Sequence, residues 1–344
     1  MSGRLIVNVN KIRENILNIK ARINSSLFCA VVKANCYGFG IDLCKHIEDI
    51  VDYFAVATLA EARELAKIVN KRILVLTPPS ICEIKGYKDI PVNIEFAVDS
   101  NQTLEWLVSR MHEYRIHIAV NTGMNRHGVN YTDYIEMLDV IKGCKGISLV
   151  GVFSHLYSAI KEDINKQYNR FLPFIDAAKK MNKDIICHLS NSSGLIHCLD
   201  MVRVGIGMYN VEDTDCFRLE SRILNIRTID KGEVIGYNAH FVAKSNMRVA
   251  VVPVGYADGI MRAMGGGNVI VNGKLCKIVG DICMDCFMVD VSNCGAAKVG
   301  DRVVIIGSTN KQSINICQIA TKCDTICYEL LSRIGSRVQR VYKI

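Results

Sequence analysis

Residues 28–40, FCAVVKANCYGFG, join a short apolar run to a lysine, a tyrosine and two glycines. The run FCAVV (28–32) shows no alternation of apolar and polar residues, which is typical of a strand buried on both faces of a parallel sheet. Similar runs follow at YFAVA (53–57), ILVL (73–76), IEFAV (94–98), IHIAV (116–120), LVGVF (149–153), IICHL (185–189) and MVRVG (201–205). The sequence therefore predicts eight parallel strands by residue 205.

The stretches between most of these runs have the periodicity of helices. Asn10 is a candidate N-cap for KIRENILNIKARI (11–23), and ATLAEARELAKIV (57–69) is rich in strong helix formers. Ser100 or Asn101 is expected to cap a later helix. Eight strand-then-helix units are the number that a (β/α)8 TIM-type barrel requires. A doubly wound sheet is the structural alternative, and periodicity alone does not exclude it.

The pattern changes after about residue 218. Strand-like runs separated by Gly, Asn and Lys turns now follow at close spacing: SRILNIRTI, EVIGYNAHFVA, RVAVVPV, NVIVNG, KLCKIVG and DRVVIIG. We therefore expect an α/β chain with a barrel over residues 10–218 and a C-terminal all-β or mostly-β domain over residues 219–344. The N-terminal strand at 1–9, which contains LIVNV, is expected to join the second domain, as in the family named below.

Composition sets limits on the class of protein. Of the 344 residues, 50% are hydrophobic and 22% are charged, as in ordinary globular proteins, which excludes a disordered chain. The net charge of +8 is spread along the sequence without a basic block, so we expect no nucleic-acid partner. No window reaches 18 apolar residues, so we expect no membrane span.

The 15 cysteines bear on the cellular compartment. An odd number of cysteines without a secretory leader favours reduced thiols and a cytoplasmic location. Cys283 and Cys286 form the one close pair, and no second pair stands at zinc spacing, so we expect no metal.

Several polar residues fall at or just after the predicted strands. They follow the first, fifth, sixth, seventh and eighth strands, and they are Lys33, Arg126, His155, Ser192 and Arg203. A barrel would bring them together at its C-terminal rim, where barrel enzymes place their active sites and commonly bind phosphate after strands seven and eight. A lysine desolvated at that mouth has a lowered pKa and is a candidate Schiff-base amine, whereas a lysine in a solvated loop is not.

Eight segments together are similar to a known family. KANCYGFG (33–40) resembles the pyridoxal-phosphate lysine motif of the alanine racemase family. The other segments follow in the family's order: NTGMNRHG (121–128), VFSHL (152–156), HLSNSSG (188–194), MVRVGIGMY (201–209), VPVGYADG (252–259), GDICMDCFMVDV (280–291) and YELLSRIGSRVQRVY (328–342). This resemblance implies the barrel-plus-β fold and a pyridoxal 5'-phosphate enzyme.

The resemblance also implies residue roles. Lys33 and Tyr256 would be the two bases of an amino-acid racemase, and Lys33 would also carry the cofactor. The implied cofactor-binding residues are Lys33, Tyr37, His155, Ser192, Arg203, Gly205 and Ile206, and the implied substrate-binding residues are Arg126, Met284 and Asp285. In the family the tyrosine comes from a second subunit, so a homodimer with a shared active site is implied. The expected reaction interconverts L-alanine and D-alanine for peptidoglycan precursors.

The chain departs from the family pattern at four informative positions. Ala119 stands where many members carry a lysine that orients the arginine, and Asn121 replaces an aspartate. Asp281 stands where an arginine is usual, and Ser336 lies near the position of an aromatic gate. These departures leave other functions open: a racemase of serine or another larger amino acid, a decarboxylase, or a pyridoxal-phosphate-binding relative without catalysis.

Overall fold

A computed structural model describes residues 3–110, 112–212 and 215–344. The chain divides into two compact units. The barrel unit contains Asn15–Asn35 and Cys44–Met208, and the β unit contains Met1–Glu14, Cys36–Leu43 and Tyr209–Ile344. The domain limits 10–218 and 219–344 stay a prediction, and residues 1–2 of the strand expected at 1–9 lie outside the described residues.

The barrel unit is built on eight parallel strands, which confirms the predicted fold class. Their sheet order is β8-β7-β6-β5-β4-β3-β2-β9, so each strand up to β8 pairs with the next one along the chain. The strands are β2 (Leu27–Val31), β3 (Tyr53–Val56), β4 (Arg72–Val75), β5 (Ile94–Val98), β6 (Tyr114–Ala119), β7 (Ile147–Phe153), β8 (Ile186–His188) and β9 (Met201–Val204). Each lies on one of the predicted apolar runs.

The barrel is nearly closed between its first and last strands. β9 pairs with β2 in parallel register, which places Arg203 opposite Cys29. Between β8 and β9, Asp200 N–H donates to the Cys187 carbonyl and Arg203 N–H to the Ser190 carbonyl, both at 3.1 Å. These bonds bring the end of β9 beside the end of β8, so that Arg203 faces residues of both neighbouring strand ends.

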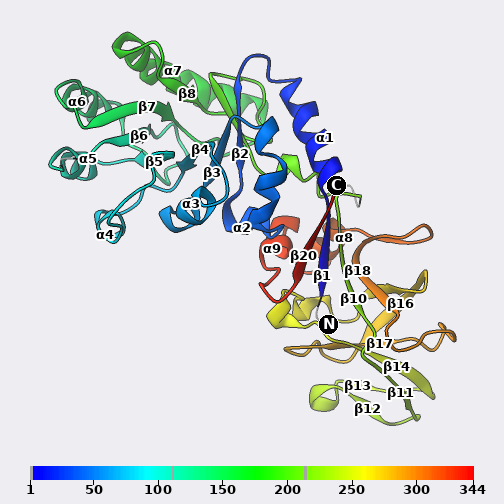
Figure 1. Cartoon of the computed structure of the whole chain (residues 1–344). Coiled ribbons are helices and arrows are strands. Elements are labelled where there is room, and N and C mark those ends of the chain that lie inside the picture. The colour runs from blue at the N-terminus through cyan, green and yellow to red at the C-terminus, as the bar shows by residue number, and fades with distance from the viewer. Residues whose placement is uncertain (1–2, 111, 213–214) are drawn as a thin grey trace. The chain divides into compact units, whose positions relative to one another are not determined.

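Helices follow five of the barrel strands and lie outside the sheet (Figure 1). They are α3 (Leu59–Ala66), α4 (Ile81–Lys85), α5 (Asn101–Val108), α6 (Tyr131–Lys142) and α7 (Lys161–Met181). The prediction of Ser100 as a cap is confirmed, because its side chain accepts from Thr103 N–H at 3.2 Å. Thr58 and Glu61 form a reciprocal capping box at the start of α3.

The prediction of Asn10 as an N-cap is wrong. Helix α1 (Val9–Lys20) begins one residue earlier, directly after strand β1 (Arg4–Asn8). Asn8 supplies the capping contact, because its side-chain oxygen accepts from Lys11 N–H at 3.2 Å. The apolar pattern locates the helix, but the position where the strand ends selects which of two neighbouring asparagines can reach the free N–H groups.

Two of the expected strand-then-helix units lack a full helix. The chain after β8 runs as a loop over residues 189–200, and β9 is followed by a single 3-10 turn, Ile206–Met208. Asn and Ser side chains in the first loop bond to nearby backbone groups, as Asn191 does to Ser193 N–H at 3.0 Å, and such bonds favour turns over helix. The rim at these two strands is therefore made of open loops.

The β unit contains a ten-stranded sheet and a two-stranded hairpin. The main path runs β11-β14-β17-β16-β15-β18-β10-β1-β20, and β19 pairs with β18. These strands are β10 (Phe217–Arg222), β11 (Asn225–Ile229), β14 (Met247–Val252), β15 (Asn268–Val271), β16 (Lys274–Val279), β17 (Phe287–Asp290), β18 (Arg302–Ser308), β19 (Ser313–Ile314) and β20 (Gln339–Lys343). β1 pairs antiparallel with β10 and parallel with β20.

The β unit differs from the predicted runs in two places. The run EVIGYNAHFVA divides into a hairpin of β12 (Val234–Ile235) and β13 (Phe241–Val242). Two short helices, α8 (Ile316–Lys322) and α9 (Cys327–Ser332), also belong to this unit, so it is mostly β rather than all β.

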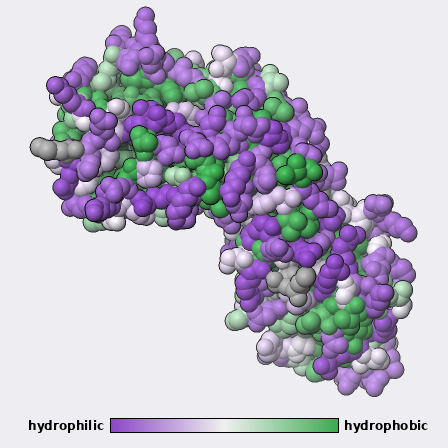
Figure 2. Space-filling model, viewed as in Figure 1, coloured by the Kyte–Doolittle hydropathy of each residue, from purple (hydrophilic) through white to green (hydrophobic). Residues whose placement is uncertain are grey.

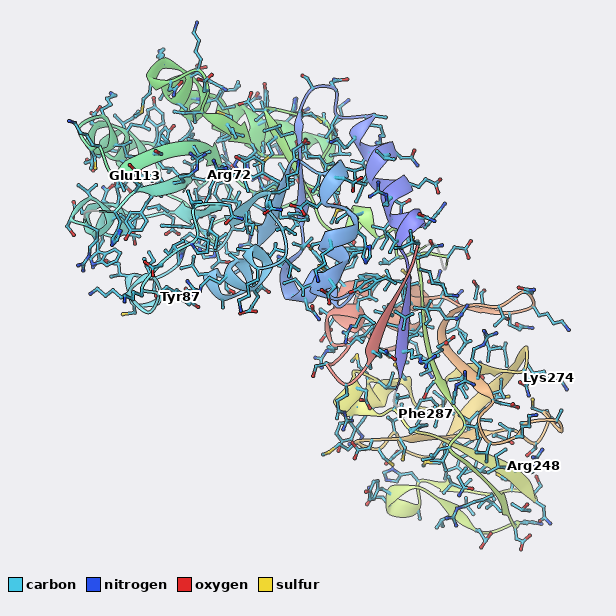
Figure 3. All side chains as sticks on the ribbon, in the orientation of Figure 1. Arg72, Tyr87, Glu113, Arg248, Lys274 and Phe287 are labelled. Atoms are coloured by element: carbon cyan, nitrogen blue, oxygen red, sulfur yellow. The ribbon has the colours of Figure 1, made fainter. Side chains whose placement is uncertain are left out.

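The surface and the helices carry no membrane signal. None of the described helices has the length and apolarity that crossing a bilayer requires. The visible face is largely hydrophilic, with smaller hydrophobic areas between (Figure 2), and charged side chains such as Arg248 and Lys274 extend from the strands of the β unit (Figure 3).

We expect Phe28→Ala, in the buried strand β2, to lower the free energy of unfolding by about 3–5 kcal/mol, because it opens a cavity beside fully buried neighbours. Urea denaturation measures the loss. Leu17→Ala on α1 is the control, since this side chain is 50% exposed and its removal should change stability by only about 0.5 kcal/mol. Equal losses in the two variants would contradict the assigned packing of β2.

Candidate active site

A cavity of about 240 Å³ lies at the C-terminal ends of the barrel strands. Lys33 follows β2, Arg126 lies in the loop after β6, and His155 follows β7, and all three side chains line the cavity. Segments more than 100 residues apart in sequence therefore meet at one rim, as the predicted barrel requires. Leu76, Ala119 and other apolar residues form part of the wall.

Lys33 stands at the mouth of this cavity. Its side chain is exposed, but the cavity wall removes part of its water, and this desolvation together with the positive charge of Arg126 lowers its pKa, against the opposing effect of Glu61. A lysine with a lowered pKa carries a larger fraction of neutral amine, which is the nucleophilic form.

The backbone after Lys33 is strained. Residues 34–37 have φ between 52° and 55°, a left-handed conformation that costs each non-glycine residue about 1–2 kcal/mol. Glu61 holds the first of them, because its carboxylate accepts from Ala34 N–H at 2.7 Å while also accepting from Ala57 N–H at 2.8 Å. Such strain is characteristic of functional segments that their surroundings hold in place.

Arg203 is a buried cation below the cavity. It is only 2% exposed, and its guanidinium donates to the carbonyls of Ser154 at 2.7 Å and Leu189 at 3.3 Å. It also contacts the imidazole Nδ1 atoms of His188 at 2.6 Å and His155 at 3.4 Å. Desolvation lowers the pKa of Arg203 to about 10, so the group stays charged at neutral pH.

His155 is neutral at physiological pH. Burial, followed by the positive charges of Arg203, Arg126 and Lys33, lowers its pKa to about 3. A guanidinium can only donate, so the Nδ1 atom that faces Arg203 is an acceptor and the proton resides on Nε2. His155 therefore presents an N–H group away from Arg203.

Ser192 and two backbone amides form an anion cradle. The Ser192 hydroxyl oxygen accepts from Gly205 N–H at 3.0 Å and from Gly207 N–H at 3.3 Å, on either side of Ile206. A Cβ atom at position 207 would lie 3.2 Å from Ser192 Cβ, so glycine permits this close approach. Converging N–H groups with a hydroxyl are a common phosphate-binding arrangement.

Asn121 organises the loop that carries Arg126. Its side-chain oxygen accepts from Gly123 N–H at 2.9 Å and Asn125 N–H at 3.2 Å, and its amide donates to the Asn125 side chain at 2.8 Å. Ala119 is buried in an apolar cluster with Phe153. The loop is therefore ordered by an asparagine turn rather than by a charged side chain at position 119.

In the β unit, Tyr256, Met284 and Asp285 lie on two joined turns. Tyr256 N–H donates to the Cys283 carbonyl and Ala257 N–H to the Met284 carbonyl, both at 3.0 Å. A Cβ at Gly255 would lie 2.3 Å from the Cys283 carbonyl oxygen, so this close contact of two backbones requires glycine. Tyr256 and Met284 project outward and are 44% and 52% exposed.

Arg337 ties the same two turns together, and the sequence analysis did not single it out. Its guanidinium makes a bidentate contact with Asp258 at 2.9 and 3.0 Å and donates to Asp285 at 2.8 Å. The position of Arg337 within the quoted segment RVQRVY was the available signal. Asp285, expected to bind substrate, thus also bonds within its own unit.

Two other expected or divergent positions also lie in the β unit. The Tyr37 ring lies 5.6 Å from that of Tyr209, and burial raises the pKa of Tyr37 to about 12. Asp281 pairs with His240 at 2.9 Å and Arg262 at 3.4 Å, so its charge is partly balanced where the family usually has an arginine.

The structure therefore groups the predicted site residues by unit. The barrel unit contains Lys33, Arg126, His155, Ser192, Arg203, Gly205 and Ile206, and the β unit contains Tyr37, Tyr256, Met284 and Asp285.

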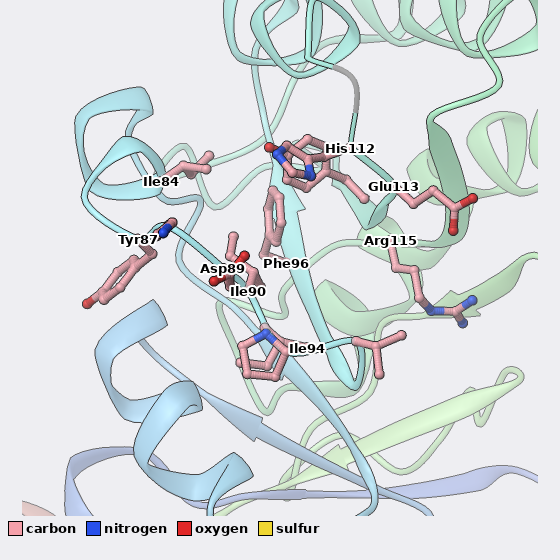
Figure 4. A pocket seen from close by; sticks show the side chains of 13 residues that line it. Ile84, Tyr87, Asp89, Ile90, Ile94, Phe96, His112, Glu113 and Arg115 are labelled. Atoms are coloured by element: carbon pink, nitrogen blue, oxygen red, sulfur yellow. The ribbon is translucent and has the colours of Figure 1, made fainter.

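A second hollow of about 160 Å³ lies at the opposite ends of the barrel strands (Figure 4). Ile94 at the start of β5 and Tyr114 at the start of β6 line it, together with Phe96 and Arg115. Barrel enzymes keep their catalytic groups at the C-terminal ends of the strands, so the cavity at Lys33 is the candidate active site.

Comparison with known proteins agrees with this geometry. Residues 7–213 match the family model described as alanine racemase, N-terminal domain, and residues 216–342 match alanine racemase, C-terminal domain. The chain belongs to the alanine racemase family. An alanine racemase of Francisella tularensis subsp. novicida is 33% identical over 98% of each chain, and alanine racemase 1 of Caldanaerobacter subterraneus is 31% identical over 98% of this chain and 94% of the relative.

Solved structures of the family share the fold. Alanine racemase from Bacillus anthracis with bound L-Ala-P is 27% identical, with a TM-score of 0.90 over 100% of this chain and 95% of that chain. Alanine racemase from Clostridium difficile 630 is 30% identical, with a TM-score of 0.90 over 100% of this chain and 96% of that chain.

The pKa of His155 predicts how stability depends on pH. In the unfolded chain the imidazole protonates near its ordinary value of 6.5, whereas in the folded chain it protonates only at about 3. The unfolded state therefore binds more protons between these values, and the free energy of unfolding should fall as the pH is lowered from 6.5 toward 3. His188, whose pKa burial also lowers, acts in the same direction.

Urea denaturation without added cofactor at about pH 7.5 and about pH 5 tests this dependence. His155→Gln cannot titrate, so it should lose less stability than the unmodified protein over the same interval. An unchanged pH dependence in His155→Gln would contradict the assignment of His155 as a neutral buried group.

Proposed function

We propose that this protein interconverts L-alanine and D-alanine with pyridoxal 5'-phosphate bound at Lys33. The carrying observation is the meeting of a lysine of lowered pKa with His155 and Arg126 in one cavity at the barrel rim, within a chain of the alanine racemase family. The product D-alanine would supply peptidoglycan precursors, and the cytoplasm is the proposed location.

The residues present fit the proposed cofactor. Lys33 offers an amine for its aldehyde, and Ser192 with the N–H groups of Gly205 and Gly207 offers a cradle for its phosphate. Bound pyridoxal phosphate supplies a conjugated ring that acidifies the α-hydrogen of an attached amino acid. Tyr37, at the end of the strained segment after Lys33, is proposed as a further cofactor contact.

Arg203 is proposed to contact the pyridine nitrogen of the cofactor. Its guanidinium stays charged and can only donate a hydrogen bond, so the ring nitrogen opposite it must accept. An unprotonated pyridine withdraws less negative charge from the reacting carbon, which limits side reactions such as transamination. The fixed carbonyl contacts of Arg203 hold the cation in one position.

Lys33 and Tyr256 are proposed as the two bases that move the α-proton on opposite faces. Arg126, exposed at the cavity, would hold the substrate carboxylate, with Met284 and Asp285 contributing from the β unit. A phenol has an unperturbed pKa near ~10, so Tyr256 needs a partner to act at neutral pH. The N–H group of the neutral His155 is the proposed partner.

A homodimer is proposed to complete the site, with Tyr256 supplied by the other subunit. Support comes from the β unit, where a hollow of about 590 Å³ is lined by exposed apolar side chains. Val234, Tyr237 and Met284 are 55%, 67% and 52% exposed around it. Apolar surfaces of this kind commonly mark protein interfaces.

In deuterated water with pyridoxal phosphate, we expect L-alanine to racemise and to gain α-deuterium, followed by polarimetry and mass spectrometry. Lys33→Ala and Tyr256→Phe should each reduce the rate by roughly a thousandfold or more. Tyr131→Phe is the matched control, because this tyrosine is 45% exposed and lies on α6, away from the cavity. Faster turnover of serine would redirect the substrate assignment, and release of carbon dioxide would contradict racemisation.

Mixed dimers test whether the site is shared. Lys33→Ala and Tyr256→Phe chains, each inactive alone, should regain about a quarter of the full activity when they are unfolded together and refolded. The reason is that half of the random dimers are mixed, and each mixed dimer has one intact site of two. Failure to regain activity, with normal dimer formation, would place both bases in the same subunit.

A further inference from the structure

A chain of buried hydrogen bonds leads from Arg203 to a carboxylate inside the barrel. Arg203 contacts His188 Nδ1 at 2.6 Å, and His188 Nε2 lies 2.9 Å from His117 Nδ1. His117 Nε2 lies 2.9 Å from a carboxylate oxygen of Glu95. His188, His117 and Glu95 are all 0% exposed, so no solvent reaches this part of the chain.

The end groups determine where every proton lies. Arg203 can only donate, so His188 Nδ1 accepts and His188 carries its proton on Nε2. That N–H donates to His117 Nδ1, which leaves the His117 proton on Nε2, where it donates to the Glu95 carboxylate. All hydrogen bonds therefore run in one direction, from the guanidinium to the carboxylate.

Two arginines at the far end hold Glu95 ionised. Arg115 Nε donates to the second carboxylate oxygen at 2.8 Å, and Arg72, labelled in Figure 3, lies 3.8 Å from it. Arg115 lines the hollow at the N-terminal ends of the strands (Figure 4). Burial by itself would raise the pKa of Glu95, but its contacts with His117 and Arg115 lower it overall.

We propose that Glu95 is a positioning residue for the reaction, which fixes the tautomers of His117 and His188 so that Arg203 is held as a donor toward the cofactor. This inference rests on the proposed function, because it gives Arg203 the role described there. A buried carboxylate balances the buried guanidinium through two neutral imidazoles, and neither imidazole can reverse its hydrogen bonds without placing two N–H groups against each other.

The tautomers can be observed directly in the holoenzyme labelled with ¹⁵N-histidine. Long-range ¹H–¹⁵N correlation spectra should show both His117 and His188 neutral and protonated on Nε2. The two signals are identified by their loss in His117→Gln and His188→Gln. Protonation on Nδ1, or on both nitrogens, in either residue would overturn the proposal, and this test requires no activity and no folded Glu95 variant.

Glu95→Gln should reverse the chain. Arg115 can only donate, so the amide oxygen turns toward Arg115 and the NH₂ group faces His117, which moves each imidazole proton to Nδ1 and sets an N–H against Arg203. We expect kcat to fall roughly tenfold while KM for alanine changes less than about twofold, since a misplaced charged donor costs about this much. The visible absorption of the bound cofactor should shift as well.

A second substitution separates this role from general loss of structure. In Glu95→Gln combined with Arg115→Met, the amide oxygen is free to face His117, so the original tautomers and most of the lost kcat should return. Glu220→Gln is the matched control: it removes a carboxylate that is 9% exposed and paired with Arg218 at 2.8 Å in the β unit, and should leave kcat unchanged.

The outcomes distinguish the two proposals. A Glu95→Gln enzyme with unchanged kcat and unchanged cofactor absorption would overturn the role of Glu95 while leaving the racemase function intact. A further loss of kcat in the double variant would also overturn it. Absence of racemisation by the unmodified protein would instead remove the proposed function, and the histidine spectra would still report on the tautomers.

Discussion

The buried guanidinium of Arg203 is the constraint on which the barrel unit depends. A charge that is only 2% exposed must have its N–H groups satisfied, and here the acceptors come from residues at the ends of β7 and β8. They reach Arg203 only because β9 returns beside β8 and pairs with β2. The same pairing places Arg203 opposite Cys29, in the strand that leads to Lys33. Closure of the barrel and placement of the charged groups are thus one structural requirement.

Single polar side chains hold the loops above this core. Glu61, Asn121 and Ser192 each accept hydrogen bonds from two or more backbone N–H groups of the rim. Each therefore orders a segment that carries a proposed functional group. This explains how a rim that lacks helices after β8 and β9 still presents defined groups to the cavity.

The β unit orders its own part of the proposed site by similar means. Arg337 neutralises Asp258 and Asp285, and backbone hydrogen bonds join the turn of Tyr256 to the turn of Met284. Tyr256 is thus an exposed side chain on a rigid support, as a group contributed to another surface would need to be. Asp281 contributes to this support by pairing with His240 and Arg262, so the departure from the family pattern is locally balanced.

The sequence by itself determined the eight barrel strands, the change to a β-rich second part and the family, because apolar runs and motif order are local properties of the chain. It also located Lys33, Arg126, His155, Ser192 and Arg203 at strand ends. Only the tertiary structure decided that Asn8 rather than Asn10 caps α1, that Asn121 orders the Arg126 loop, and that Glu95, His117 and His188 lie in contact below Arg203. The physical reason is that hydrogen bonds between neighbouring strands depend on register and closure, which no local pattern contains.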